Sequence, residues 1–197
     1  MTVQNKGLRI AFTGRRNVGK STAVRRLERQ GFIQVHAFTG GKIAAAAYLD
    51  HILQYTEFEG MGYRMVFGDL KDVPCPALPG GVAPREFLER FGKFMGVDMG
   101  VEWTLKTEVE RVERIYGKHV NIAVDSMIYE SKYWRDIGGV IVRLNRPDFK
   151  GQPVVESDAA QAGVAHDHEL FAETPEAVEE NIDFLLKSLL TKRSEAD

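Results

Sequence analysis

The stretch GRRNVGKS, residues 14–21, decides the fold of this 197-residue chain. It matches the pattern G-x-x-x-x-G-K-[ST], in which glycines permit a tight loop, backbone N–H groups surround phosphate oxygens and a lysine neutralises their charge. The apolar run LRIAFT, residues 8–13, predicts a strand before it, and residues 20–30 have the spacing of a helix after it. Because the N-terminal end of that helix would face the anion, the segment is expected to be a P-loop.

Every residue of the loop and of the following helical turn is expected to contribute to nucleotide binding. Lys20 would neutralise phosphate charge, and Ser21 would hold Mg²⁺. Arg15 and Arg16 lie within the loop, where they would contact phosphate or cover the nucleotide base. The predicted nucleotide-binding set is Gly14, Arg15, Arg16, Asn17, Val18, Gly19, Lys20, Ser21 and Thr22.

Strand and helix patterns alternate along the rest of the chain. Further strands are expected at residues 32–37, 120–124, 140–144 and 170–172. Thr174 is expected to cap a final helix that Pro175 opens. Alternating strands and helices form a mostly parallel sheet covered on both faces. The expected fold class is therefore α/β, a three-layer P-loop NTPase fold with about five strands and a short lid.

The length fits one α/β domain over residues 1–197. Within it we expect an acceptor-binding helical region at about 39–116 and a lid at about 146–167, because the latter segment is polar and has no strong period. The clearest long loop is PCPALPGGVAP, residues 74–84.

Composition and charge favour small-molecule partners. With Lys+Arg 26 against Asp+Glu 28, the net charge of −2 supplies no field that would attract nucleic acid or an anionic membrane. The single cysteine, Cys75, excludes an intrachain disulfide and a multi-cysteine zinc site, and fits a reducing cytoplasm. The sequence shows neither a membrane-spanning stretch nor a signal-peptide pattern, so a cytoplasmic location is expected. A monomer and a homodimer both remain open.

A P-loop enzyme also needs a carboxylate at the end of a neighbouring strand, where it holds Mg²⁺ or the water ligands of the ion. Asp125 directly follows the predicted strand VNIAV, residues 120–124. We therefore expect Ser21 and Asp125 to organise Mg²⁺.

A GTPase-like switch is the alternative from a different class. The segment GRRNVGKST, residues 14–22, is similar to the first motif of small GTPases, and NRPD, residues 145–148, resembles the guanine-reading N-K-x-D motif. The matching D-x-x-G candidate is DIGG, residues 136–139. It lies almost adjacent to NRPD, whereas the two GTPase motifs normally stand a helix and a strand apart. This spacing disfavours the switch.

A phosphotransferase needs cations for the acceptor and a lid that excludes water. Lys42 follows a Gly-Gly turn at a predicted helix start, and Arg85 stands at the start of another helix. Arg143 and Arg146 flank the predicted lid. Trp103 offers a ring that can stack on a nucleobase. The predicted substrate-binding residues are Lys42, Arg85, Trp103 and Arg143.

Several blocks in order resemble the deoxynucleoside monophosphate kinases of bacteriophages, which belong to the adenylate-kinase-like group of P-loop proteins. The blocks are the P-loop, TGGKIAAAAYL (39–49), PREFLERFGKFMG (84–96) followed by Trp103, VDSMIYESKYWRDIGGVIVRLNRP (124–147) and the C-terminal helix. In this family the fourth block usually contains Asp-x-Arg-Phe before a Gly-Gly and an Arg-Pro pair. Asp125 and the later pairs match, whereas Met127 occupies the arginine position.

The resemblance implies that the γ-phosphoryl group of ATP moves to a (deoxy)nucleoside monophosphate, giving ADP and the diphosphate. Lys20, Asp125 and Arg146 would be catalytic, with Arg146 near the lid and the phosphates. Lys42 and Arg85 would lie on the acceptor side. Kinases of other small acceptors, such as dephospho-coenzyme A, share this machinery and form the near alternative. For a viral chain the expected location is the host cytoplasm.

Overall fold

A computed structural model describes residues 6–100, 102–147 and 156–195. The chain divides into two compact units. The P-loop unit comprises Met1–His36 and Thr107–Asp197, and the helical unit comprises Ala37–Lys106.

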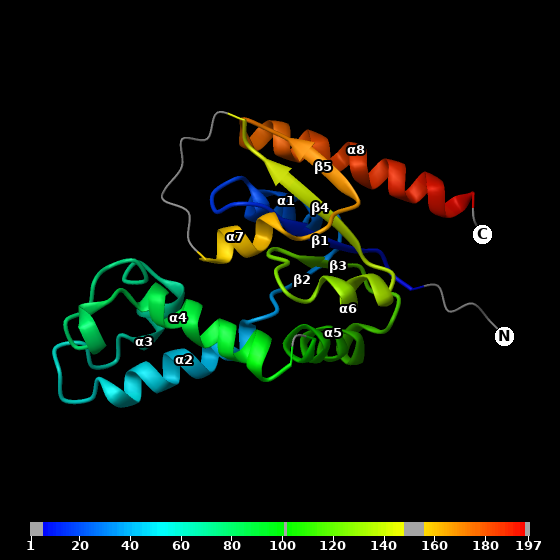
Figure 1. The fold of residues 1–197 in the computed structure, drawn as a ribbon. Helices are drawn as coiled ribbons and strands as arrows, with labels where there is room; N and C mark the ends of the chain where they lie inside the picture. Colours follow the sequence, from blue (N-terminus) through cyan, green and yellow to red (C-terminus); the bar gives the residue numbers. More distant parts are fainter. Residues whose placement is uncertain (1–5, 101, 148–155, 196–197) are drawn as a thin grey trace. The chain divides into compact units, whose positions relative to one another are not determined.

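The P-loop unit is built on a five-stranded parallel sheet (Figure 1). Its strands are β1 (Arg9–Thr13), β2 (Ile33–Val35), β3 (Ile122–Val124), β4 (Val140–Asn145) and β5 (His168–Phe171). The order is β2-β3-β1-β4-β5, and all four pairings are parallel. The predicted α/β class with about five strands is confirmed. Because all strands run the same way, their carboxyl ends meet at one edge of the sheet.

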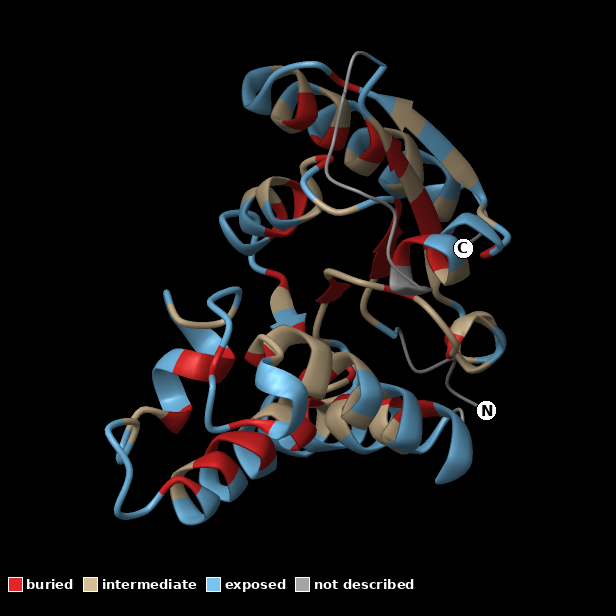
Figure 2. Ribbon diagram, turned by 60° about the vertical axis from the view of Figure 1, so that its left-hand side comes forward, coloured by how far each residue is buried: buried red, intermediate tan, exposed pale blue. Residues whose placement is uncertain are grey.

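Helices α1 (Lys20–Glu28) and α8 (Pro175–Ser194) cover one face of the sheet. Ile10 and Phe12 of β1 share a buried core with Leu27 of α1 and Ile182 of α8. In Figure 2 the central strands are coloured as buried, while helices carry buried residues on one side and exposed residues on the other. The alternation of side chains along β1 directs its remaining residues to the opposite face.

The opposite face carries α6 (Ser131–Asp136) and the Thr107–Tyr116 part of α5 (Trp103–Tyr116). Arg9 of β1 forms a buried ion pair with Glu113 of α5. Its guanidinium also donates to the carbonyl oxygen of Ile137, 3.2 Å away, directly after α6. Trp134 of α6 is fully buried, and its Nε1 donates to the carbonyl oxygen of Val140 at 3.1 Å. The sheet is therefore the middle of three layers.

Of the elements that follow β4, the final helix α8 matches the prediction from the sequence, whereas the predicted lid differs from it. The hydroxyl of Thr174 accepts the N–H of Ala177 at 3.2 Å and Pro175 opens α8, as predicted. The predicted lid, in contrast, contains a helix that the sequence pattern did not indicate, α7 (Glu156–Ala162). Residues 148–155 of the predicted lid lie outside the described residues.

The helical unit contains α2 (Thr39–Ile52), α3 (Gly62–Phe67), a 3₁₀ turn (Pro79–Gly81), α4 (Pro84–Lys93), a π-helical turn (Phe94–Asp98) and the first turn of α5. Leu49, Met65 and Leu88 share its core, and Cys75 of the long loop is buried there too. Among the described residues, no helix is long and apolar enough to cross a lipid bilayer.

Candidate phosphate-binding site

Residues 14–19 form a tight loop between the carboxyl end of β1 and helix α1, which begins with Lys20 and Ser21. Gly14 and Gly19 have φ angles of +133° and +104°, which side chains with a Cβ rarely adopt. A Cβ on Gly14 would lie 2.4 Å from the carbonyl oxygen of Leu144, and one on Gly19 would lie 2.9 Å from a methyl carbon of Val178. Both positions therefore require glycine, and the loop places backbone N–H groups at a positive helix end.

Lys20 folds back across the loop. Its Nζ donates to the carbonyl oxygens of Gly14 and Arg15, the latter at 2.7 Å. Burial lowers the pKa of Lys20 to about 8, and the nearby carboxylates of Asp158 and Asp125 oppose this decrease. The lysine thus lies in the field of two carboxylates that come from distant parts of the sequence.

Asp125 directly follows β3, at the same sheet edge as the P-loop, because β3 and β1 are parallel neighbours. Its Oδ2 lies 3.5 Å from Nε2 of Gln34, and its Oδ1 lies 3.9 Å from Nε2 of His36. Among the described residues Oδ1 is buried without a hydrogen-bond partner. A carboxylate oxygen without a hydrogen bond and the Ser21 hydroxyl are hard oxygen donors of the type that Mg²⁺ prefers, so both residues fit the predicted ion.

Asp158 is a site residue that the sequence reasoning missed. It lies on α7, and its side chain is only 3% exposed. One carboxylate oxygen accepts the backbone N–H of Arg16 at 2.9 Å, and the other lies 3.4 Å from Nε of the same arginine. The hydroxyl of Thr13 donates to the carbonyl oxygen of Gln161 at 3.2 Å. Helix α7 is therefore anchored at two points, on the P-loop and on the last residue of β1.

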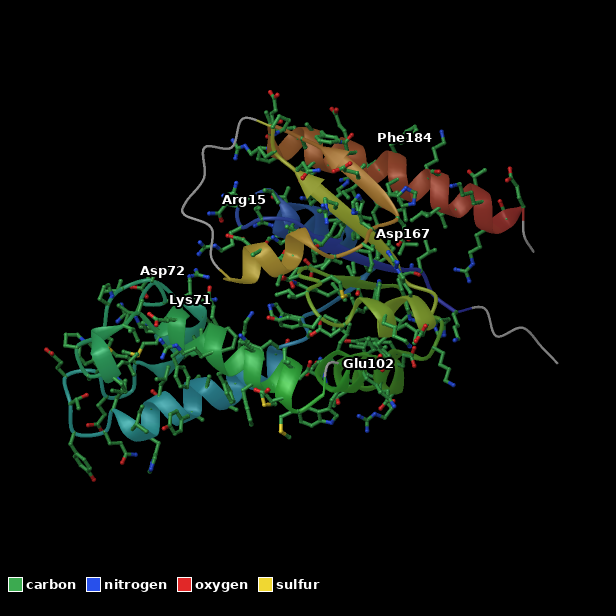
Figure 3. The ribbon with its side chains drawn as sticks, viewed as in Figure 1. Arg15, Lys71, Asp72, Glu102, Asp167 and Phe184 are labelled. Atoms are coloured by element: carbon green, nitrogen blue, oxygen red, sulfur yellow. The ribbon has the colours of Figure 1, made fainter. Side chains whose placement is uncertain are left out.

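The other residues predicted to bind nucleotide have different surroundings. Arg15 is exposed at the loop, where Figure 3 labels it, and Asn17 is exposed with a φ angle of +62°. Val18 is buried in the core beneath α1 and α8, so its side chain supports the loop. Ser21 is exposed and Thr22 half-buried in the first turn of α1.

The two arginines around the predicted lid differ in their surroundings. Arg143 of β4 donates to the carbonyl oxygens of Ala162 and Val164, at 2.9 and 2.7 Å. These bonds attach the chain that follows α7 to the sheet. Arg146 is exposed, immediately after β4. Ligand contacts for both arginines stay predictions.

Met127 stands where the resembled family has an arginine. It is fully buried, and its backbone N–H donates to the carbonyl oxygen of Phe12 at 2.8 Å. A buried apolar side chain at this position belongs to the core of the P-loop unit and offers no charge to a phosphate.

Three predicted acceptor residues belong to the helical unit. Lys42 is half-buried on α2, and Trp103 is 51% exposed at the start of α5. Arg85, in the first turn of α4, is ion-paired with Asp72, which Figure 3 labels. Their roles toward an acceptor stay predictions.

The two GTPase-like segments lie at different edges of the sheet. DIGG, residues 136–139, leads into the amino end of β4, whereas the P-loop leaves the carboxyl end of β1. Since β1 and β4 are parallel, DIGG is at the edge opposite to the P-loop. In NRPD, the amide of Asn145 donates to Glu169 at 2.7 Å, and Asp148 lies outside the described residues. DIGG is therefore not placed to sense a phosphate in the P-loop.

The sheet order and the loop at its carboxyl edge define an α/β protein of the P-loop class. No protein-family model and no curated protein matches the chain. Among solved structures, a crystal structure described as that of a "putative kinase" from Chloroflexus aurantiacus J-10-fl is similar over 95% of this chain and 98% of that chain. The two share 10% sequence identity with a TM-score of 0.47, a likeness too weak to carry a conclusion.

Proposed function

We propose that the chain is a magnesium-dependent kinase that transfers the γ-phosphoryl group of ATP to a (deoxy)nucleoside monophosphate, acting in the cytoplasm, or in the host cytoplasm for a viral chain. The observation that carries the proposal is the arrangement at the carboxyl edge of the sheet. There the P-loop with Lys20 follows β1, and Asp125, whose Oδ1 has no hydrogen bond among the described residues, follows the adjacent strand β3. Phosphoryl transfer requires these groups and no protein nucleophile.

In the proposed reaction an oxygen of the acceptor phosphate attacks the γ-phosphorus of ATP. The bond between the γ-phosphorus and the β,γ-bridging oxygen breaks, and the bond's electron pair leaves with ADP. Lys20 would neutralise charge on the transferred group, and Ser21 and Asp125 would hold Mg²⁺. When bound, Mg²⁺ supplies charge neutralisation for the β- and γ-phosphates.

The proposed class of acceptor rests on the family resemblance described above, which includes the two segments that carry Lys42 and Arg85. Arg85 is half-buried and held by Asp72, so its guanidinium is fixed near the start of α4. A guanidinium held in this way presents its remaining N–H groups in a planar fork that suits a phosphate. The switch alternative has less support, because DIGG and the P-loop lie at opposite edges of the sheet.

The proposal is tested by ADP release from ATP and Mg²⁺ in the presence of a panel of nucleoside and deoxynucleoside monophosphates. We expect release that depends on at least one monophosphate. Dephospho-coenzyme A is included as an acceptor that is not a nucleoside monophosphate, and GTP is included as a second phosphoryl donor. Slow GTP hydrolysis that no acceptor stimulates would contradict the kinase and favour the switch.

A further inference from the structure

The carboxylate of Asp158 is buried against the P-loop although nothing in the P-loop motif demands it. Both of its oxygens contact one loop residue, since Oδ1 accepts the backbone N–H of Arg16 and Oδ2 lies beside the guanidinium of Arg16. A hydrogen bond to a charged acceptor is stronger than one between neutral groups, and a buried carboxylate that lost it would be left unsatisfied. The contact therefore constrains the backbone of Arg16 strongly.

The helix that carries Asp158 is itself held in place. Thr13, the last residue of β1, donates to the carbonyl oxygen of Gln161. Arg143 of β4 donates to the carbonyl oxygens of Ala162, the last residue of the helix, and of Val164 just after it. Asp158 is thus presented from a support that is bound to the adjacent strands β1 and β4, and a rigid support makes a side chain effective in positioning its partner.

We propose that Asp158 is a positioning residue of the phosphate site, which holds Arg16 and so fixes the P-loop in the conformation that receives the phosphates of a nucleoside triphosphate. This inference rests on the proposed function only in assigning a nucleoside triphosphate to the P-loop. The identity of the acceptor does not enter it.

A carboxylate close to a phosphate site also repels the phosphates, which would make Asp158 inhibitory. Two observations favour positioning over repulsion. The guanidinium of Arg16 compensates the charge of Asp158, and one oxygen of Asp158 accepts a backbone N–H of the loop at 2.9 Å. That contact acts on the loop backbone, which forms the phosphate cradle.

The test is equilibrium binding of MgATP to the full-length chain without an acceptor. We expect Asp158→Ala to raise the Kd about tenfold, because the support of the binding groups is lost. Asp158→Asn should stay within about threefold of the wild type, because its amide oxygen still accepts the N–H of Arg16. Asp158→Glu keeps the charge but displaces the carboxylate, so it should resemble Asp158→Ala and serves where the alanine variant folds poorly.

Asp167→Ala is the matched control. Asp167 also accepts one backbone N–H, that of Ile141 at 2.8 Å, and also contacts one arginine, Arg135 at 3.3 Å. It lies near the amino end of β4, and Figure 3 shows it well apart from Arg15 at the P-loop. Removing it should affect the melting temperature and leave the Kd for MgATP unchanged, which separates positioning of the loop from general stability.

Unchanged or tighter MgATP binding by both Asp158→Ala and Asp158→Glu would overturn the inference, and the proposed function would stand. Normal MgATP binding without transfer to any acceptor would overturn the proposed function and leave the inference intact. A wild-type chain that binds neither MgATP nor MgGTP would overturn both.

Discussion

Lys20 donates a hydrogen bond from its Nζ to the carbonyl oxygen of Gly14, so that the last cation of the P-loop closes onto its first residue. A phosphate that enters the loop would meet this ammonium group, which the fold has already desolvated. This hydrogen bond therefore holds the lysine that is proposed to neutralise phosphate charge against the backbone of the loop.

Replacing Lys20 by alanine tests the role of this charge. We expect Lys20→Ala to lower the rate of phosphoryl transfer by about 100-fold or more, because charge stabilisation in a desolvated site is a large part of the catalytic effect. The melting temperature should change little, because the desolvation of the ammonium group offsets the hydrogen bonds that the substitution removes. Lys132→Ala, an exposed lysine paired with Asp136, serves as the control. Turnover retained by Lys20→Ala would show that the loop is only a structural turn.

Asp125→Asn tests the assignment of Mg²⁺. The substitution removes the charge of the carboxylate whose buried Oδ1 accepts no hydrogen bond from the described residues, so the Mg²⁺ concentration at half-maximal ADP release should rise about tenfold or more. Asp136→Asn provides the control, because Asp136 is exposed and precedes β4 at the other edge of the sheet. An unchanged Mg²⁺ dependence in Asp125→Asn would remove Asp125 from the site.

Alanine substitutions at two glycines with positive φ angles distinguish steric crowding from backbone strain. Gly14→Ala places a Cβ 2.4 Å from a carbonyl oxygen of β4, whereas Gly31→Ala meets no atom within 4 Å. We expect the first to lower the free energy of unfolding by more than about 2 kcal/mol, and the second by about 1 kcal/mol from left-handed strain alone. Urea denaturation measures both. Equal losses would mean that β4 yields to the side chain and that the loop is not tightly seated.

Glu130 gives the protein a further pH dependence. It is buried, and one of its carboxylate oxygens accepts the backbone N–H of Tyr129 at 3.1 Å. Burial raises the pKa of Glu130 above its ordinary value of 4.5. Its contribution to stability is fully present below pH 4.5, and it is lost as the pH rises through the elevated pKa of the folded state.

Glu130→Gln should therefore gain stability relative to the wild type as the pH rises from about 4 to 7, because glutamine does not ionise. The measurement is the free energy of unfolding by urea at several pH values in this range. Glu28→Gln, which changes an exposed glutamate of α1, should follow the wild type. A constant difference between Glu130→Gln and the wild type across the range would refute the buried ionisation.

The parts of the fold predicted from the sequence are those encoded by neighbouring residues. The P-loop combines glycine conformations and a cation within eight positions, and Thr174 and Pro175 start α8 by bonds within a single turn. The sequence alternates between strand patterns and helix patterns. This alternation predicted the parallel sheet, because two parallel strands must be joined by a long crossover that is usually a helix. Local chemistry and the observed structure agree at each of these places.

The missed features depend on contacts between distant residues. Asp158 is 142 positions from Arg16, and its short helix α7 lacks a regular apolar stripe. The bonds from Arg143 to two backbone carbonyl oxygens were also not predicted, because every residue supplies a carbonyl and the sequence does not show which one is used. The six-residue helix α3 was missed because so short a segment shows barely more than one period.

The most direct measurement of the central claim is the stoichiometry of the products formed from ATP, Mg²⁺ and the monophosphate that best stimulates ADP release. Phosphorus NMR or ion-exchange chromatography resolves ADP, nucleoside diphosphate and inorganic phosphate in one reaction mixture. A kinase of the proposed kind yields one nucleoside diphosphate for each ADP from ATP, without inorganic phosphate. ADP and inorganic phosphate in equal amounts, with the monophosphate unchanged, would contradict it.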